Sequence, residues 1–238
     1  MTAVEHPAGG LKCHAPRLRP RLYDLLRGLM RALFHLFTRV HVTFLAGCPE
    51  RGPAIVAVNH LSYFDGPLVF AMLPLRVRPL AADRYRRHPF GLLLAATGAI
   101  FVRRGQPDRA AVRATLEVLA EGGCLAVAVE GTRSRDGRLH EGKNGVAYLA
   151  ARTGAPLIPA AVWGTERIGA SLRRLRRPDV YLCLGAPIVL DAPSLDVLSL
   201  DISRLDETTR GIVDAIAAML PARYLPAAGA APQPGERA

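Results

Sequence analysis

Apolar and polar residues follow two different periods along this chain. Short, mostly apolar runs rich in Val, Ile and Ala occur at 53–60, 76–82, 99–104, 124–131, 155–163 and 180–190. Stretches with apolar residues three or four positions apart separate them, at 67–74, 85–97, 108–123, 143–153 and 206–220. Runs of the first kind predict buried strands and those of the second predict helices. Their alternation predicts one α/β domain with a mostly parallel sheet covered by helices on both faces.

Residues 21–40 carry a different, amphipathic pattern. Leucines recur at helical spacing, while Arg27, Arg31 and His35 fall largely on another face of the predicted helix. Two interpretations stay open: the helix covers the core, or it lies in a membrane interface with its arginines towards lipid phosphates. We expect four parts in the chain: a disordered basic arm, an amphipathic membrane-interface helix, the α/β domain and a disordered tail, at 1–20, 21–47, 48–224 and 225–238.

The charge of the chain narrows the choice of partner. The 238 residues include 31 Lys and Arg against 20 Asp and Glu, a formal charge of +11, and nearly all of the basic residues are arginine. Such a surplus predicts an anionic partner. Aromatic residues are few, and no segment alternates basic and aromatic residues as a base-stacking surface does, so we expect no nucleic acid. An anionic membrane lipid or a phosphorylated metabolite fits better.

Cysteines and apolar segments bear on the compartment. The four cysteines lie far apart and indicate neither a zinc site nor a disulfide framework, which is typical of a reducing compartment. The first twenty residues lack a signal-peptide pattern, and no segment reaches the roughly 18 to 20 apolar residues that span a bilayer. We expect a protein of the cytoplasm that can attach peripherally to the cell membrane.

Polar clusters follow three of the predicted strands. Asn59 and His60 end the first run with Asp65 shortly after, Arg103 and Arg104 end another, and 130–134 (EGTRS) end a third. Carboxyl ends of parallel strands meet at one edge of a sheet, so we expect these clusters to lie together. The arginines and hydroxyls can bracket a phosphate with charge-assisted hydrogen bonds.

The pair of His60 and Asp65 has a structural and a chemical interpretation. Asp65 can belong to a capping box with Ser62, or it can itself cap the helix, which places Pro67 harmlessly in the first turn. A carboxylate there can also hold the His60 ring in one tautomer and leave its other nitrogen free as a base. No G-x-S-x-G motif or cysteine pattern supplies a nucleophile. The substrate is therefore expected to bring the hydroxyl that such a base activates.

These residues resemble the 1-acylglycerol-3-phosphate acyltransferases and their glycerolipid relatives. The first block of that family, N-H-x-S-x-x-D, is matched by Asn59, His60, Ser62 and Asp65. The other three blocks are matched by GAIFVRR with Gly98 and Arg104, by EGTRS at 130–134, and by APLIPAAVWG with Pro159. The resemblance covers roughly residues 21 to 190. Ala128 and Val129 replace the usual Phe-Pro before the third block, which bears on acceptor specificity more than on the type of reaction.

The resemblance implies a glycerolipid acyltransferase fold and transfer of a fatty acyl group from a thioester to the sn-2 hydroxyl of lysophosphatidic acid, giving phosphatidic acid. By that analogy His60 is the base and Asp65 orients it. Arg104 and Arg133 hold the phosphate, and the remaining block residues line the pocket: Asn59, Ser62, Glu130, Gly131, Thr132 and Ser134. The implied donor is acyl-CoA or acyl carrier protein, with no metal and no further cofactor.

Two other functions stay open at this point. A related acyltransferase for a different lysolipid or an amino-lipid would keep Asn59, His60 and Asp65. A non-enzymatic protein could use the fold and the basic helix for membrane binding alone, but adhesion to lipid does not require His60, Asp65 or the EGTRS segment.

Overall fold

The computed structural model describes residues 19–47, 49, 51–105, 108–190 and 202–226. At its centre lies a seven-stranded sheet with the order β1-β7-β6-β2-β5-β3-β4. Neighbouring strands are parallel except for the antiparallel pair of β6 and β7. The expected mostly parallel sheet is thus confirmed. The strands are β1 (Arg39–Phe44), β2 (Ala54–Val58), β3 (Val77–Ala82), β4 (Ile100–Val102), β5 (Cys124–Ala128), β6 (Leu157–Trp163) and β7 (Asp179–Leu184).

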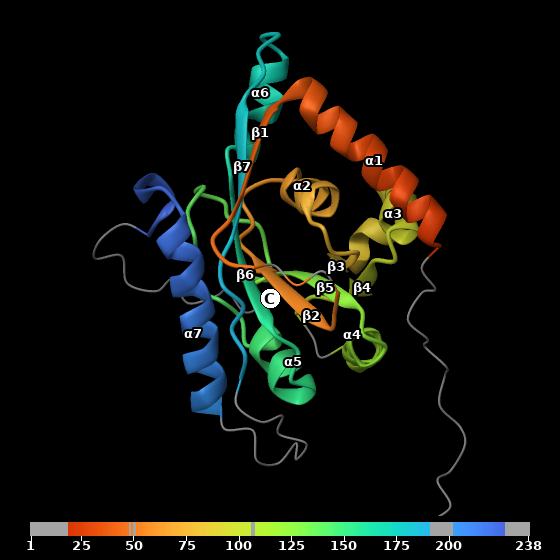
Figure 1. Ribbon diagram of the computed structural model, residues 1–238, viewed down its shortest axis with the longest axis vertical. Coiled ribbons are helices and arrows are strands. Elements are labelled where there is room, and N and C mark those ends of the chain that lie inside the picture. Colours follow the sequence, from red (N-terminus) through yellow and green to blue (C-terminus); the bar gives the residue numbers. More distant parts are fainter. Residues whose placement is uncertain (1–18, 48, 50, 106–107, 191–201, 227–238) are drawn as a thin grey trace, which may run out of the picture.

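Helices cover both faces of this sheet (Figure 1). The α-helices are α1 (Pro20–Phe37), α2 (Asp65–Met72), α3 (Pro89–Ala96), α4 (Arg109–Ala120), α5 (Gly145–Thr153), α6 (Ile168–Leu172) and α7 (Ile202–Met219). Helices α4, α5 and α7 pack into one apolar cluster, and α1, α2 and α6 into a second. The 3-10 turns are η1 (Asp83–Arg87), η2 (Thr165–Arg167) and η4 (Ala222–Tyr224). The expected single α/β domain is the architecture observed.

Strand β2 lies between β5 and β6, and all five of its side chains are buried. Ile55 and Ala57 belong to the cluster of α4, α5 and α7, whereas Ala54, Val56 and Val58 belong to the cluster of α2. A strand covered on both faces needs apolar residues at every position, which explains its uninterrupted run. The carboxyl end of β2 therefore projects from the middle of the sheet.

The N-terminal part differs from the expectation in one element. Helix α1 ends at Phe37, where both the backbone N–H and the hydroxyl of Thr38 donate to Phe34 O. Residues 39–44 form the edge strand β1, parallel to β7, so the helix expected over 21–47 is wrong after Phe37. The alternating residues of RVHVTF are too few to stand out beside a strong helical pattern. The expected arm at 1–20 and tail at 225–238 fall almost wholly outside the described residues.

The helix expected over 85–97 is divided. Its first residues form η1, and α3 begins at Pro89. A proline lacks the N–H that a continuous helix needs and is tolerated in a first turn, so the division falls where the sequence allows it. This break leaves the arginines of η1 on a separate turn beside the end of β4.

Helix α1 presents its apolar stripe to solvent. Leu25, Leu29 and Leu36 are 68%, 55% and 63% exposed. The arginines turn the other way, since Arg27 Nη1 donates to Pro74 O (3.3 Å) and Arg31 Nε to Ala71 O (3.1 Å). The interpretation that these arginines point towards lipid phosphates is therefore wrong: they bind carbonyls that follow or end α2.

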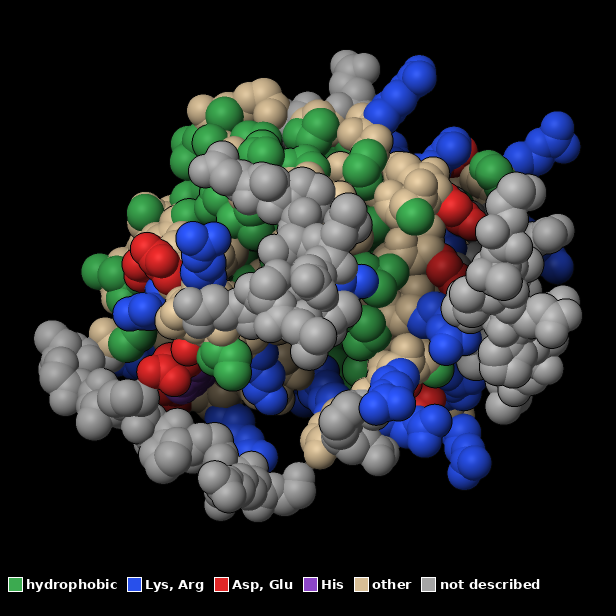
Figure 2. All heavy atoms as spheres, turned by 90° about the horizontal axis from the view of Figure 1, so that it is seen from below, with side chains coloured by type: hydrophobic (Ala, Val, Ile, Leu, Met, Phe, Trp, Pro, Cys, Tyr) green, Lys and Arg blue, Asp and Glu red, His purple; other side chains and the backbone are tan. Residues whose placement is uncertain are grey.

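Tyr23 and Phe34 fasten α1 to the domain. Both side chains are buried, and Tyr23 Oη donates to Val77 O (3.0 Å). Among the described residues, no helix is long and apolar enough to cross a membrane. The view from below shows many more basic than acidic side chains, gathered mainly along one side of that face (Figure 2).

Candidate active site

Three of the sequence-predicted clusters meet at one edge of the sheet. The backbone N–H of His60, after β2, donates to Glu130 Oε1, after β5 (3.1 Å). The backbone N–H of Ser134 donates to His60 O (2.8 Å). Strands β2, β5, β3 and β4 are parallel neighbours, so their carboxyl ends point the same way. The segment after β5 thus braces the residue that follows β2.

His60 and Asp65 form a hydrogen-bonded pair, with His60 Nδ1 2.9 Å from Asp65 Oδ2. The same carboxylate oxygen accepts the backbone N–H groups of Leu61 and Ser62, both at 2.7 Å. Asp65 is almost fully buried, whereas the His60 side chain is 22% exposed. An ionised carboxylate accepts hydrogen bonds only, so Nδ1 carries the proton and Nε2 keeps its lone pair. No described residue bonds to Nε2, which suits a base that waits for a substrate proton.

Thr165 completes this arrangement from η2. Its hydroxyl is fully buried and donates a short hydrogen bond to Asp65 Oδ1. Gly164, just before it, has φ +84°, and a Cβ there would lie 2.4 Å from Asp179 O. A glycine is therefore needed for the turn that presents Thr165. Sequence reasoning missed Thr165, and its only signal is a position just after a buried strand.

The expected helix cap is not formed by Asp65. Helix α2 begins at Asp65 with Phe64 as N-cap, and no side chain caps it. The carboxylate instead reaches back to the loop at His60, Leu61 and Ser62. Pro67 does lie in the first turn, as expected. The loop before α2 is therefore folded around Asp65, which fixes the direction of the His60 ring.

Two residues expected in the substrate pocket have structural partners instead. Asn59 is fully buried, and its amide exchanges two hydrogen bonds with the backbone of Val162 on β6 (2.9 and 2.7 Å). Ser62 Oγ accepts the N–H of Phe64 (3.0 Å), and the residue is buried. We correct their assignment from substrate binding to holding the ends of β2 and of the following loop.

Glu130 is buried with a free carboxyl oxygen. Oε1 accepts the N–H of His60, while Oε2 has no hydrogen-bond partner among the described residues. Burial raises the pKa of Glu130 to about 7, and the hydrogen bond from His60 and the nearby charge of His140 oppose that rise only in part. Glu130 thus supports the backbone of His60 rather than facing the substrate directly.

The other residues of EGTRS shape the loop. Gly131 has φ +70°, which favours glycine, and its neighbour Thr132 is exposed. Ser134 Oγ donates to Asp136 Oδ1 (2.8 Å) and accepts the N–H of Arg138 (3.0 Å). Of this segment, the structure leaves Thr132 and Arg133 free to meet a ligand.

Three arginines lie near the pair of His60 and Asp65. None of them forms an ion pair with a carboxylate among the described residues. Arg133 Nη2 donates to Tyr63 Oη (2.8 Å), and its Cζ lies 3.6 Å from the centroid of the Tyr63 ring. Arg84 Nη2 donates to Tyr85 Oη (3.3 Å). Arg104 forms no side-chain hydrogen bond with a described residue, and the charges of Arg84 and Arg133 act on it. We call Arg84, Arg104 and Arg133 the arginine cluster; sequence reasoning missed Arg84, which lies just before the helix expected over 85–97.

Two pKa shifts indicate a positive potential at the arginine cluster. The pKa of Arg104 is lowered by the enclosure of its guanidinium, then by the charges of Arg84 and Arg133. Burial acts to raise the pKa of Tyr85, but the hydrogen bond from Arg84 and the charges of Arg84 and Arg133 outweigh it and lower the pKa. Both directions favour negative charge, as a phosphate site requires.

An apolar groove leads to this cluster from α1. It measures about 750 Å³. One wall comes from α1 and another from α6, and its polar end includes Arg84 and Arg133. The apolar side chains that line it include Met30, Leu33, Phe34, Phe37, Phe64, Ile168 and Leu172. Its size and lining suit an acyl chain whose charged end meets the arginines.

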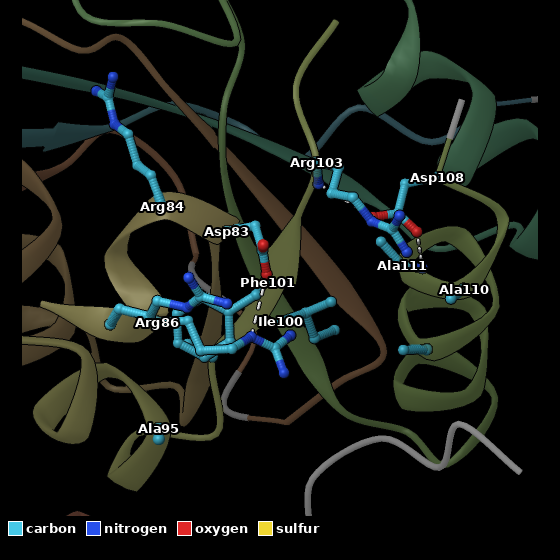
Figure 3. A pocket seen from close by; sticks show the side chains of 13 residues that line it. Asp83, Arg84, Arg86, Ala95, Ile100, Phe101, Arg103, Asp108, Ala110 and Ala111 are labelled. Atoms are coloured by element: carbon cyan, nitrogen blue, oxygen red, sulfur yellow. Dashed lines mark hydrogen bonds and ion pairs between the residues drawn. The ribbon is translucent and has the colours of Figure 1, made fainter. Parts of the chain in front are cut away.

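A second cavity, of about 960 Å³, is also lined by Arg84. Figure 3 shows η1 with Arg86 on one side, Arg103 with Asp108 on the other, and Ile100 and Phe101 of β4 between them. Arg86 Nε pairs with Asp83 (3.0 Å), and Asp108 caps α4 by accepting the N–H of Ala111 (3.1 Å). We call this cavity the basic cleft. Arg84 lines both it and the apolar groove.

The comparisons with known proteins identify the family. The model of the acyltransferase family matches residues 39–163, more than half of the chain. The chain belongs to the acyltransferase family. The matched range contains His60, Asp65, Arg104 and Arg133 and ends just before Thr165.

Named relatives share limited identity. A 1-acyl-sn-glycerol-3-phosphate acyltransferase of Borreliella burgdorferi is 30% identical over 134 residues, 54% of this chain and 52% of that protein. A chloroplastic 1-acyl-sn-glycerol-3-phosphate acyltransferase, BAT2 of Brassica napus, is 27% identical over 72% of this chain and 52% of its own length. This chain therefore spans about half the length of these curated relatives.

One solved structure shares the fold. The crystal structure of the 1-acyl-sn-glycerophosphate acyltransferase PlsC from Thermotoga maritima has a TM-score of 0.59 and 24% identity, covering 84% of this chain and 81% of that one. Within the described part of our structure, no group of three or more His, Cys, Asp or Glu side chains could hold a metal ion.

Proposed function

We propose that this protein transfers a fatty acyl group from a thioester to the sn-2 hydroxyl of a 1-acylglycerol-3-phosphate, giving phosphatidic acid. The observation that carries the proposal is the placement of an oriented His60 beside an arginine cluster without a carboxylate partner. A base with no serine or cysteine nucleophile bonded to it calls for a hydroxyl from the substrate. The arginines supply binding for a phosphate on the same molecule.

His60 acts as the general base in this reaction. Nε2 takes the proton of the sn-2 hydroxyl while the oxygen attacks the carbonyl carbon of the thioester. Nδ1–H stays bonded to Asp65, which stabilises the imidazolium that forms. The C–S bond then breaks, the ester stays on the glycerol, and the departing thiolate takes the proton from Nε2. Every proton that His60 accepts is returned within one cycle.

The acceptor spans the arginine cluster and the apolar groove. Its phosphate meets Arg84, Arg104 and Arg133, with the Tyr63 and Tyr85 hydroxyls close by. Its acyl chain extends along the groove towards α1, because the groove is apolar beyond Arg84 and Arg133. The glycerol between phosphate and chain is then held next to the loop that carries His60.

The exposed stripe of α1 fits attachment to a membrane. The apolar face of this helix is partly to largely exposed, and it consists of Leu22, Leu25, Leu29, Leu33, Leu36 and Phe37. Insertion of this stripe into the interface would bring the groove, which α1 itself lines, up to the bilayer that contains the acceptor. The burial of Tyr23 and Phe34 keeps the helix fixed to the domain meanwhile.

The basic cleft fits the phosphates of the donor. Arg87 lines it and forms no hydrogen bond or ion pair with a described residue, and Arg103 lies at its other side, with Nε 3.8 Å from Asp108 Oδ2. Acyl-CoA and acyl carrier protein both carry the acyl group on phosphopantetheine, so both bring a phosphate. From the cleft, the pantetheine arm would pass Arg84 to reach the groove and His60, since Arg84 lines both cavities.

The donor proposal predicts a selective effect of Arg87→Ala and Arg103→Ala. We expect the KM for acyl-CoA to rise about tenfold in the double variant, because two charge-assisted contacts are lost from an exposed site. The KM for acyl-pantetheine, which lacks the phosphates, should stay unchanged, as should both values in the control Arg113→Ala on α4. Equal rises for both donors would contradict the placement.

The reaction itself is tested with a panel of acceptors. Purified protein is incubated with acyl-CoA and, in separate assays, 1-acylglycerol-3-phosphate, lysophosphatidylcholine, lysophosphatidylethanolamine and an amino-lipid, and the products are identified by mass. We expect phosphatidic acid, formed at least about 100-fold more slowly by His60→Ala. Transfer mainly to another acceptor would keep the chemistry and replace the substrate, and no transfer to any acceptor would contradict the proposed function.

A further inference from the structure

The turn that follows α6 exposes a leucine among arginines. Its sequence is RRLRR, 173–177, and Leu175 is 97% exposed. Leu175 also has φ +52°, a conformation that an L side chain rarely adopts. The turn is nevertheless held by backbone bonds from the N–H groups of Arg174 and Arg176 to Ser171 O (3.0 and 2.9 Å). An ordered leucine that is fully exposed to water does not stabilise the core. Its exposure is instead typical of a residue that contacts an apolar partner such as a membrane.

We propose that this turn is a second membrane contact, in which Arg173, Arg174 and Arg176 bind the phosphates of anionic lipids and Leu175 enters the interface. The side chains of these three arginines are exposed and form no hydrogen bond or ion pair with any described residue. Guanidinium groups bind phosphates with paired hydrogen bonds, and neighbouring positive charges strengthen attraction to an anionic surface.

The RRLRR turn supplies positive charge for anionic lipid that the leucine stripe of α1 lacks. Arg27 and Arg31 of α1 donate to backbone carbonyls near the end of α2, and the exposed stripe beside them consists of leucines such as Leu25, Leu29 and Leu36. An apolar helix face alone does not distinguish an anionic membrane from a neutral one. The RRLRR turn would add that preference.

The RRLRR turn and the exposed apolar stripe of α1 lie on the same surface of the protein. Arg177 Nη2 donates to His35 O (2.5 Å) and Thr38 O (2.9 Å), which ties the base of the turn to the end of α1. Leu36 and Phe37, at that end, are 63% and 45% exposed. Figure 1 shows α6 and the turn at the same end of the molecule as the end of α1. A bilayer that meets the last turns of α1 therefore also meets the turn.

The apolar groove lies between these two contacts. Leu33 and Phe37 of α1 and Ile168 and Leu172 of α6 line it. A membrane held at α1 and at the RRLRR turn would border the groove on both sides, so a lysolipid could pass from the bilayer into the groove. This inference rests on the proposed function only for the identity of that lipid, since binding to vesicles is measured without catalysis.

The test compares vesicle binding of charge-matched variants. R173E/R174E is set against R113E/R204E, which changes the charge equally through two exposed arginines of α4 and α7, on the other face of the sheet. Flotation uses vesicles of phosphatidylcholine with and without phosphatidylglycerol. At about fivefold per arginine, we expect R173E/R174E to weaken binding to the anionic vesicles by about 25-fold or more. The control should change it by less than about threefold.

The apolar part is tested with Leu175→Ser. We expect it to lower binding to both kinds of vesicle by about threefold to tenfold, the loss typical of one buried leucine at an interface. Ile202→Ser on α7, 70% exposed, is the control and should not change binding. L25S/L29S in α1 gives the reference loss for the stripe.

Several outcomes separate this inference from the proposed function. If the parent protein binds vesicles and the turn variants bind like it, the inference is wrong and the reaction is untouched. Binding by neither parent nor variants contradicts both membrane contacts. Activity on a short-chain, water-soluble lysophosphatidic acid should stay at the parental level in every turn variant. Loss of that activity would show a folding defect, and the vesicle test would then use R173A/R174A in place of the charge reversal R173E/R174E.

Discussion

The His60 pair and the arginine cluster lie at the same edge of the sheet but are built in opposite ways. Asp65 is 1% exposed and accepts hydrogen bonds from His60, Leu61, Ser62 and Thr165. In the arginine cluster, Arg84 and Arg104 are exposed, and the side chains of Arg84 and Arg133 donate to tyrosine hydroxyls. Asp65 is fully paired within the protein, whereas the arginine cluster has no carboxylate partner among the described residues.

The difference follows from what each region does in the proposed reaction. A base must present one nitrogen in one direction, and buried partners fix it before the substrate arrives. A phosphate site must keep unpaired positive charge, and exposure lowers the cost of holding three arginines together because water screens their repulsion. Substitutions should therefore change turnover at the first region and acceptor affinity at the second.

His60→Ala should give the largest effect. We expect kcat to fall by about two to four orders of magnitude, as removal of a general base typically does. The side chain is partly exposed and its backbone contacts to Glu130 and Ser134 remain, so the thermal midpoint should change little. Steady-state kinetics and a thermal melt check both parts. Near-normal turnover would contradict the proposed mechanism.

Asp65→Asn should have the second-largest effect on kcat. An amide cannot accept from all of its present donors, so the His60 ring loses its fixed tautomer, and kcat should fall about 100-fold or more. Unfolding free energy should also fall, by about 2 to 4 kcal/mol, because buried N–H groups lose a charged acceptor.

Thr165→Val separates the contribution of Asp65 to kcat from its contribution to stability. It removes one donor and keeps the shape, so we expect kcat to fall by about threefold to tenfold and Thr165→Ser to restore it. A stability loss in Thr165→Val without any change in the pH profile of kcat would assign Thr165 to folding alone.

Alanine at Arg84, Arg104 or Arg133 should act on the acceptor. We expect each substitution to raise the KM for lysophosphatidic acid about threefold to fivefold, the effect of losing one exposed charge-assisted contact, with kcat and the KM for the donor nearly unchanged. Arg113→Ala is the control. The comparison breaks down if Arg84→Ala raises the donor KM instead, which would move Arg84 from the groove to the basic cleft that it also lines.

The sequence predicted the sheet and the pair because both depend on local patterns. Runs buried on both faces identify strands, and N-H-x-S-x-x-D places His60 and Asp65 across one loop. The parallel order then brings the segments after β2, β4 and β5 together without further information.

What the sequence did not reveal depends on long-range packing. Thr165 reaches Asp65 from a hundred residues away through the order of β2 and β6, and no local pattern marks it. Asn59 matches the motif, but among the described residues its side chain bonds only to Val162, so the motif alone could not distinguish a structural residue from one that binds substrate. The direction of α1 was also open, because an amphipathic helix can dock either face when its arginines find free carbonyls.

Glu130 should have the smallest effect on rate and a distinctive effect on stability. Its pKa is raised from 4.5 to about 7, chiefly by burial. The folded state therefore binds a proton more tightly than the unfolded state does, and stability falls as pH rises from about 4.5 through about 7, where the buried carboxyl ionises.

Glu130→Gln keeps an amide oxygen for the N–H of His60 and cannot ionise. The difference in unfolding free energy between parent and variant should therefore shift in favour of the variant by up to about 3 kcal/mol from pH 4.5 to pH 8, while kcat at a fixed pH changes only a few-fold. Denaturant unfolding across that range, with exposed Glu121→Gln as control, measures it. Parallel stability profiles for parent and Glu130→Gln would mean that the carboxyl is already ionised in the folded protein at low pH, and that Oε2 has a partner which supports its charge.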